Sequence, residues 1–163
     1  SRGKRVIAEV TISNQLLREN LGVSADMLFK MRQISNVGSM MAGSVNNGAH
    51  SPNAIAAIFI ACGQDAANVA ESSAAISFVD VDSEGNYYLA MTIPSLIVAT
   101  YGGGTALPTQ KECLQLMGCF GEGKVKKLAE IIGATVLAGE LSLSAAVLAG
   151  DWVTSHDSLG RNR

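Results

Sequence analysis

One carboxylate interrupts the most apolar stretch of this sequence. From Asn53 to Val69 almost every residue is small or apolar, and Asp65 lies inside this run with two amide side chains. Pro52 suits the first turn of a helix, and apolar residues would occupy every face of it, so we predict one long, buried helix. A buried carboxylate is costly unless partners compensate its charge. Asp65 is therefore either a hydrogen-bonded structural residue or a charge that serves catalysis.

Two further features of the sequence could do chemistry. His156 lies in the polar C-terminal segment SHDSLGRNR, where an imidazole that titrates near neutral pH is either a general acid or simply a solvated side chain. The segment YGGGT, from Tyr101 to Thr105, contains three consecutive glycines, which regular helices and strands accommodate poorly. This segment is either a plain turn or a place where another group approaches the backbone closely.

The composition argues against several classes of protein. Charged residues make up 16% of the 163 residues and the formal net charge is -2, so no basic surface for nucleic acid is expected. No apolar run reaches the roughly 18 residues that span a bilayer, and the N-terminal SRGKR lacks the apolar core of a signal peptide. Cys62, Cys113 and Cys119 show no CxxC spacing, so we expect small buried residues and no metal site. The sequence predicts a soluble, cytoplasmic protein.

Periodicity and turn residues predict the elements that must position these groups. An alternating, β-branched pattern predicts a strand from Lys4 to Ile12. A polar turn between two further strands predicts an antiparallel hairpin, from Ala75 to Val81 and from Tyr87 to Ile93, where Pro94 ends the second strand. Helices are predicted for Ser13–Asn20, from Ser24 onward, and for Leu107–Met117, Val125–Ala138 and Leu141–Thr154. The small residues from Asn36 to His50 indicate either a packed loop or a segment that a ligand or another backbone approaches closely.

Three segments, taken in order, resemble the C-terminal catalytic region of 3-hydroxy-3-methylglutaryl-CoA reductases. They are IACGQDAANV at 60–69, YGGGT at 101–105 and AGELSLSAAVLAGDWVTSH at 138–156. RGKRVIAEVTI, NVGSMMAGS and CLQLMGC extend the resemblance over nearly the whole chain. Enzymes of this family reduce the thioester to mevalonate with two NADPH, in isoprenoid precursor synthesis. The resemblance therefore implies an NADP-dependent oxidoreductase with hydroxymethylglutaryl-CoA as its substrate.

The resemblance also implies a fold and a domain organisation. It implies an α+β fold, with helices packed around the long buried helix Asn53–Val69 beside a small, largely antiparallel sheet. Residues 1–163 would form the C-terminal part of the large, substrate-binding domain, with 155–163 as a mobile tail. The small nucleotide-binding domain and the segments with the catalytic lysine and glutamate have no counterpart here, so NADH stays an alternative cofactor. An upstream half or a second subunit of a homo-oligomer is expected to complete the site, and a membrane anchor could lie outside this sequence.

The resemblance assigns roles to individual residues. Asp65 matches the catalytic aspartate that sets the protonation of the lysine and glutamate around the substrate carbonyl. His156 matches the histidine that protonates the departing CoA thiolate. The positions that line the substrate pocket correspond to His50, Asn53 and Ser142, although by local rules His50 and Asn53 could equally be a turn residue and a helix cap. The positions that contact NADP(H) through backbone N–H groups correspond to Gly102, Gly103, Gly104 and Thr105.

Some positions depart from the family pattern. Ser35 stands where the family has the lysine that pairs with the substrate carboxylate, and Thr154 and Asp157 replace the usual neighbours of His156. A carboxylate bound at Ser35 would lack its direct cation. Together with the missing upstream half, these departures support an alternative hypothesis, in which the chain is a non-catalytic structural or assembly subunit derived from the reductase fold.

Overall fold

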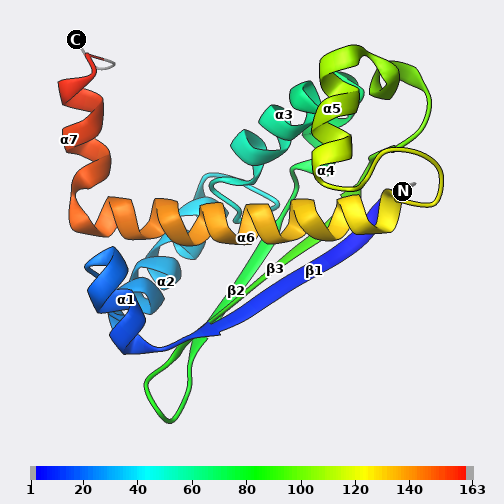
Figure 1. Cartoon of the computed structure of the whole chain (residues 1–163). Coiled ribbons are helices and arrows are strands. Elements are labelled where there is room, and N and C mark those ends of the chain that lie inside the picture. Colours follow the sequence, from blue (N-terminus) through cyan, green and yellow to red (C-terminus); the bar gives the residue numbers. More distant parts are fainter. Residues whose placement is uncertain (1–2, 161–163) are drawn as a thin grey trace.

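A small antiparallel sheet and one long helix form the centre of the fold (Figure 1). The computed structural model describes residues 3–160. The sheet has the order β1-β3-β2, and its strands are β1 (Lys4–Ile12), β2 (Ile76–Val81) and β3 (Tyr87–Leu96). Both pairings are antiparallel. The predicted first strand, the hairpin and the α+β class are thus confirmed.

Strand β3 does not end at Pro94 as predicted, but continues to Leu96. Its pairing with β1 shifts register at this point, because Lys4 faces Leu96 while Val6 faces Ile93. On its other side, the pairing with β2 stops at Thr92. Proline has no N–H to donate to a neighbouring strand. This loss costs little at Pro94, because the residue lies at the register irregularity with β1 and beyond the end of the pairing with β2.

Helix α6 (Val125–Ala149) is the long helix of the fold, and it packs against β1, β3 and α3. The sequence predicted two helices here, interrupted near Gly139; this is wrong, since the helix is continuous through that residue. The expectation that no apolar segment could span a bilayer is also wrong, since α6 passes that test by length and composition. In this structure α6 packs against β1, β3 and α3, and 33% of its most apolar 18-residue window is buried.

The predicted long helix from Asn53 to Val69 is also wrong. Helix α3 (Ser51–Ala61) is followed by a turn, a short 3-10 helix η1 (Ala66–Asn68) and the single turn of α4 (Val69–Ser72). The helix stops because Gly63 has a φ of +64° and its backbone abuts that of Gly104. The stretch is not buried on every face either, since Ile60 is 74% exposed.

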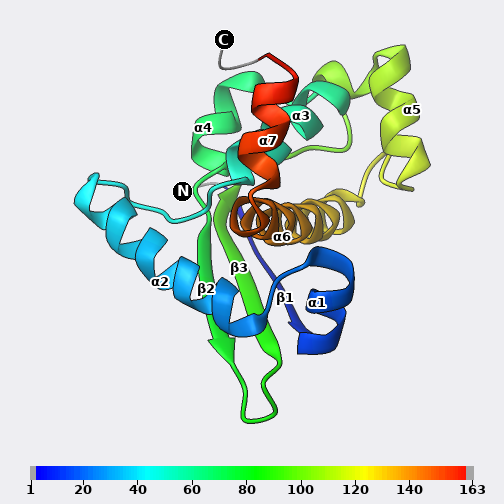
Figure 2. The same cartoon turned by 90° about the vertical axis from the view of Figure 1, so that its left-hand side faces the viewer.

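The remaining helices lie on both sides of α6 (Figures 1 and 2). Helices α1 (Asn14–Leu21) and α2 (Ala25–Met41) lie on one side, and Ser13 and Ser24, at which the two predicted helices begin, are N-caps that each accept a backbone hydrogen bond. Because α2 continues to Met41, the first part of the predicted loop 36–50 is helical. On the other side lie α3, α4, α5 (Pro108–Leu116), which the short helix η2 (Gly103–Ala106) precedes, and α7 (Asp151–Ser158).

The C-terminal region differs from the prediction at one glycine. Gly150, with a φ of +82°, ends α6 in the left-handed conformation, so the predicted helix Leu141–Thr154 is divided between α6 and α7. Residues 155–158 of the expected tail belong to α7, whereas 161–163 lie outside the described residues. The side chains that anchor the core beneath these helices are fully buried and include Leu17, Leu28, Ile55, Phe59, Leu89, Ile93, Leu128 and Ile132.

Candidate active site

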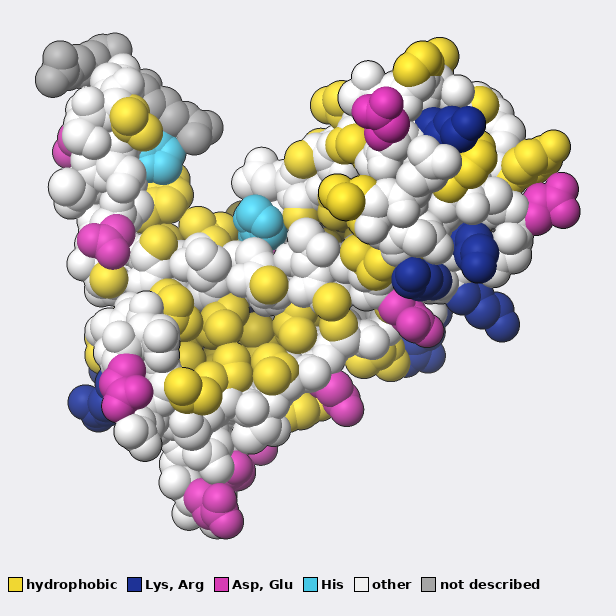
Figure 3. Space-filling view, viewed as in Figure 1, with side chains coloured by type: hydrophobic (Ala, Val, Ile, Leu, Met, Phe, Trp, Pro, Cys, Tyr) yellow, Lys and Arg dark blue, Asp and Glu magenta, His cyan; other side chains and the backbone are white. Residues whose placement is uncertain are grey.

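A hollow on one face of the molecule contains both histidines of the chain (Figure 3). Helix α6 forms its floor, α7 forms one wall, and the helices α3 and α5 form the other. His50 lies at the floor, where α3 begins, and His156 lies on the α7 wall. The fold thus directs two residues that are far apart in the sequence toward the same open space.

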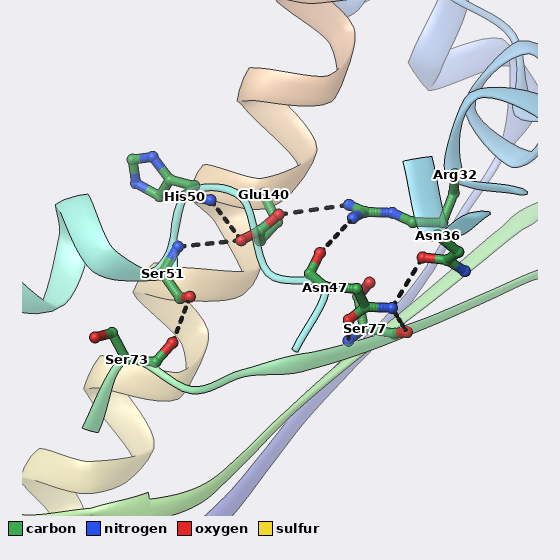
Figure 4. Close-up of polar contacts among 8 residues, drawn as sticks. All are labelled: Arg32, Asn36, Asn47, His50, Ser51, Ser73, Ser77 and Glu140. Carbon is green, nitrogen blue, oxygen red and sulfur yellow. Dashed lines mark hydrogen bonds and ion pairs between the residues drawn. The ribbon is translucent and has the colours of Figure 1, made fainter. Parts of the chain in front are cut away.

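The first turn of α3 is held by a buried carboxylate (Figure 4). Glu140, in the middle of α6, is fully buried. Its Oε1 accepts hydrogen bonds from the backbone N–H of His50 at 2.6 Å and of Ser51 at 3.1 Å. Helix N-termini present unsatisfied N–H groups and a partial positive charge, so a carboxylate there is stabilising.

Arg32 of α2 balances the charge of Glu140 and fixes the loop before α3. The guanidinium is 3% exposed, and its Nη2 lies 3.4 Å from Oε2 of Glu140, while Nη1 donates to the carbonyl of Asn47 at 3.0 Å. The Asn47 side chain in turn accepts from the N–H of Ser77 at 2.6 Å and donates to its carbonyl at 3.0 Å. The network therefore joins α2, α6, β2 and the loop that carries His50.

Sequence reasoning missed Arg32 and Glu140. The prediction interpreted Gly139-Glu140 as a break between two helices, and it assigned the buried carboxylate to Asp65 instead. One sequence feature could have indicated the network, namely an acidic residue isolated within a long apolar stretch, which must either face solvent or find a cation.

The two other predicted substrate-binding residues lie near His50. Asn53 is one turn further along α3, and Ser142 is one turn after Gly139, which contacts the His50 ring. Both side chains are exposed and make no hydrogen bond within residues 3–160. Their polar atoms are therefore available to a ligand.

Asp65 lies after the other end of α3 and is exposed, so the prediction of a buried carboxylate there is wrong. Its side chain caps the 3-10 helix η1, accepting from the N–H of Ala67 at 3.0 Å and from Nδ2 of Asn68 at 3.3 Å. Helix α3 has 11 residues and is about 16 Å long. The structure therefore separates Asp65 from His50 rather than bringing the two side chains into contact.

The glycine segment lies beside Asp65, and together they line a pocket of about 510 Å³. A β-carbon at Gly63 would lie 2.3 Å from the carbonyl oxygen of Gly104, which confirms that another group approaches the glycine backbone closely. Gln64 ties the two segments together, because it accepts from the N–H of Ala99 at 2.7 Å and donates to the carbonyl of that residue at 2.9 Å. Four of the thirteen residues that line the pocket are glycines, so part of its surface is backbone.

Part of the backbone that lines this pocket is open. Gly102 and Gly103 have φ values of +81° and +54°, and a β-carbon at either position would meet no atom within 4 Å. The backbone is therefore open to a ligand over these two residues, and Thr105 is held by a hydrogen bond from its hydroxyl to the Gly102 carbonyl at 2.7 Å. Backbone N–H groups in such turns bind phosphate or amide oxygens.

His156 is oriented by the residue one turn before it. Its ring stacks on Trp152 with a centroid distance of 4.1 Å, and its Nδ1 lies 2.6 Å from the Trp152 carbonyl oxygen. A carbonyl can only accept, so Nδ1 is the nitrogen that carries the proton of this hydrogen bond. The half-buried imidazole is therefore held in one orientation on the wall of the hollow.

Comparison with known proteins identifies the family. The model of the hydroxymethylglutaryl-coenzyme A reductase family matches residues 1–161. The chain belongs to this family. A 3-hydroxy-3-methylglutaryl-coenzyme A reductase of Methanocaldococcus jannaschii is 42% identical over 161 residues, and one of Aeropyrum pernix is 46% identical over 166 residues.

The chain is shorter than these reductases. The alignments cover 98% of it, but 40% of the Methanocaldococcus jannaschii protein and 39% of the Aeropyrum pernix protein. The reductase of Drosophila melanogaster is 44% identical over 165 residues, which are 95% of this chain and 18% of that protein. The chain thus spans less than half the length of the reductases that it matches.

The three cysteines of the chain are buried or half-buried. Burial is confirmed for Cys62 and Cys119, whereas Cys113 is half-buried, and all three thiols are free. Burial, aided by the nearby thiols of Cys113 and Cys119, raises the pKa of Cys62 to about 11. Cys62 is therefore a neutral thiol at physiological pH. Within residues 3–160, no cluster of three or more His, Cys, Asp and Glu side chains could hold a metal ion.

Proposed function

We propose that the chain is part of an NADPH-dependent 3-hydroxy-3-methylglutaryl-CoA reductase, which converts hydroxymethylglutaryl-CoA to mevalonate and CoA. The observation that carries this proposal is the family match over residues 1–161, a range that includes all the candidate site residues. The chain would be the C-terminal part of the large, substrate-binding domain. Because it spans 40% of the Methanocaldococcus jannaschii protein, the catalytic lysine and glutamate would come from an upstream half or a second subunit.

The exposure of Asp65 supports such a partner. A carboxylate that must govern a lysine and a glutamate elsewhere has to be accessible to them, and Asp65 lies at the rim of an open pocket. A covering partner would exclude water from this pocket and strengthen the interaction between the charges. Asp65 would then set the protonation of the groups that stabilise the substrate oxyanion.

A second surface supports association through α2. The C-terminal half of this helix extends away from the rest of the fold (Figure 2). Its apolar side chains are exposed, at 65% for Ile34, 77% for Met40 and 84% for Met41, and Val45 in the following loop is 92% exposed. Apolar surface of this kind marks contacts with a partner. We propose that the upstream half or a second copy of the reductase covers it, within a homo-oligomer.

The hollow between α3 and α7 would bind the acyl group and the departing thiolate. Thioester reduction needs a proton for the CoA thiolate as the carbon–sulfur bond breaks, and an imidazolium at His156 would donate it. His50, Asn53 and Ser142 would orient the hydroxymethylglutaryl and CoA moieties by hydrogen bonds. Arg32 and Glu140 keep the N-terminal end of α3 in place.

The glycine turn would hold the cofactor. Gly102 and Gly103 offer an open backbone for part of NADPH, with NADH as the alternative, and Gly104 and Thr105 would complete the turn from positions packed within the chain. NADPH, when bound, supplies the hydride for each of the two reductions. We also propose a cytoplasmic location, because α6, the helix within residues 3–160 that has the length and apolarity to cross a membrane, packs on the sheet instead.

The test is an assay of NADPH oxidation with hydroxymethylglutaryl-CoA, using the chain combined with the remaining part of the reductase. Asp65→Asn keeps the size and the capping ability of the side chain but removes its charge, so we expect kcat to fall about 100-fold or more. Asp80→Asn, which neutralises another carboxylate on β2, is the control and should leave kcat unchanged. Full activity of Asp65→Asn would overturn the assigned role.

The same assay separates the enzyme from the alternative function. If the assembled complex forms but shows no NADPH oxidation, the chain is a structural or assembly subunit derived from the reductase fold. If turnover occurs in a complex that contains no other reductase, the catalytic assignment holds.

A further inference from the structure

The His50 ring occupies the space that a side chain at position 139 would fill. A β-carbon added at Gly139 would lie 1.9 Å from Cδ2 and 2.2 Å from Nε2 of His50. The three atoms nearest to that β-carbon all belong to the His50 side chain, so backbone packing between α3 and α6 does not account for the glycine. The absence of a side chain at Gly139 therefore leaves the space in which the imidazole lies.

The next residue of α6 holds the backbone of the same histidine. Glu140 accepts the N–H of His50 at 2.6 Å, while the imidazole points away from this carboxylate (Figure 4). Two consecutive residues of the central helix thus fix His50 independently, one through its ring and one through its main chain. The charge of Glu140 is in turn fixed by Arg32, which is itself 3% exposed.

A structural role alone does not explain glycine at this position. Glycine in the interior of a helix is less favourable than alanine, because the unfolded chain has more freedom to lose. Alanine at 139 would strengthen α6 if the ring were elsewhere. The glycine is consistent with a requirement for the orientation of His50 rather than for the stability of the helix.

We infer that Gly139 and Glu140 are positioning residues that hold the His50 imidazole toward the hollow for substrate binding. The inference rests on the proposed function, in that His50 needs a fixed orientation only if it contacts the thioester substrate. Because Gly139 has no side chain, the imidazole of His50 can lie against α6 at this position. Glu140 prevents the start of α3 from moving away from that place.

The first experiment measures the orientation of His50 without any activity. In Gly139→Ala, the added methyl group must displace the ring, so the imidazole NMR resonances of His50 should shift, while those of His156 serve as an internal reference. Gly38→Ala is the matched control, because Gly38 is also helical but a β-carbon there meets nothing within 4 Å. Unshifted His50 resonances in Gly139→Ala would overturn the inference.

A second variant keeps the test decisive if Gly139→Ala does not fold. His50→Ala/Gly139→Ala removes the ring together with the obstruction, so this double variant should fold as well as His50→Ala alone. If the double variant also fails to fold, the obstruction does not come from the ring and the inference is overturned.

The last measurement is made on the assembled reductase. Gly139→Ala should raise the KM for hydroxymethylglutaryl-CoA about tenfold with a smaller change in kcat, since one hydrogen bond to the substrate is lost. Gly38→Ala should change neither. A wild-type complex without turnover would defeat the proposed function. The NMR result would still decide whether Gly139 sets the orientation of the His50 ring. Shifted resonances with an unchanged KM would overturn the positioning role.

Discussion

Two carboxylates lie near opposite ends of helix α3, Glu140 of α6 at one end and Asp65 beyond the other, and their surroundings are opposite. At the N-terminal end, Glu140 is fully buried, and two backbone N–H groups and a guanidinium surround it. Beyond the C-terminal end, Asp65 is exposed beside an open pocket, and its partners are the groups of its own turn. The first carboxylate has its full set of partners within this chain, whereas the second is available to groups from elsewhere.

The regions around Glu140 and Asp65 therefore have different roles in the fold. A buried charge is tolerated only where its partners are already in place, so the Glu140 region is a fixed framework. An exposed charge costs little free energy, so Asp65 needs no charged partner within this chain and stays accessible to one from elsewhere. Variants of the two regions should therefore differ in how far they lower the free energy of unfolding.

Loss of the buried carboxylate should have the largest effect on stability. Glu140→Ala leaves the Arg32 charge buried and unpaired, so we expect the free energy of unfolding to fall by about 3–5 kcal/mol. Chemical denaturation measures this loss. Glu130→Ala is the matched control on the same helix, because Glu130 is exposed, and it should change stability by less than about 0.5 kcal/mol. Similar losses in both variants would show that the Glu140 network is not a framework.

The turn after α3 should be sensitive to its backbone rather than to its charge. Gly63→Ala combines a positive φ with a β-carbon 2.3 Å from the Gly104 carbonyl oxygen, so we expect a loss of about 2–4 kcal/mol in denaturation experiments. Gly22→Ala has the same kind of φ, +67°, but an open environment, and should lose only about 1–2 kcal/mol. Equal losses would mean that the close approach of the two glycine backbones is not needed.

Removal of the exposed carboxylate should have the smallest effect. Asp65→Ala deletes the cap of a single 3-10 turn, so we expect the free energy of unfolding to fall by only about 1 kcal/mol. Asp65→Asn keeps an acceptor for the N–H of Ala67 and should be nearly neutral. A loss above about 3 kcal/mol for Asp65→Ala would place this carboxylate in the same class as Glu140 and remove the contrast between the two ends of α3.

The parts of the fold that were predictable are those with local causes. The strand Lys4–Ile12, the capping serines Ser13 and Ser24 and the hairpin turn follow from residues within a few positions of one another. The end of α3 was not predictable in this way, because its cause is the contact between Gly63 and Gly104. The sequence shows that both residues are glycine, but it does not show that they meet.

The candidate site was predictable only in part for the same reason. The resemblance supplied candidate residues, and the structure brings Asp65 and the glycine turn to one pocket, whereas His50 and His156 face another hollow. The carboxylate that is buried was missed, because Glu140 pairs with Arg32 across a sequence separation of 108 residues. Hydrophobic periodicity could indicate that α6 is apolar, but not which cation would reach its middle.

Gly150 has a consequence for the timescale on which His156 can respond. This glycine ends the cooperative hydrogen-bonded ladder of α6, and the eight residues of α7 beyond it include no buried side chain. A helix of this length has little stability of its own in water. The amide protons of α7 should therefore exchange with solvent in local openings that leave α6 closed, so the fold can release and recapture this imidazole without unfolding the core.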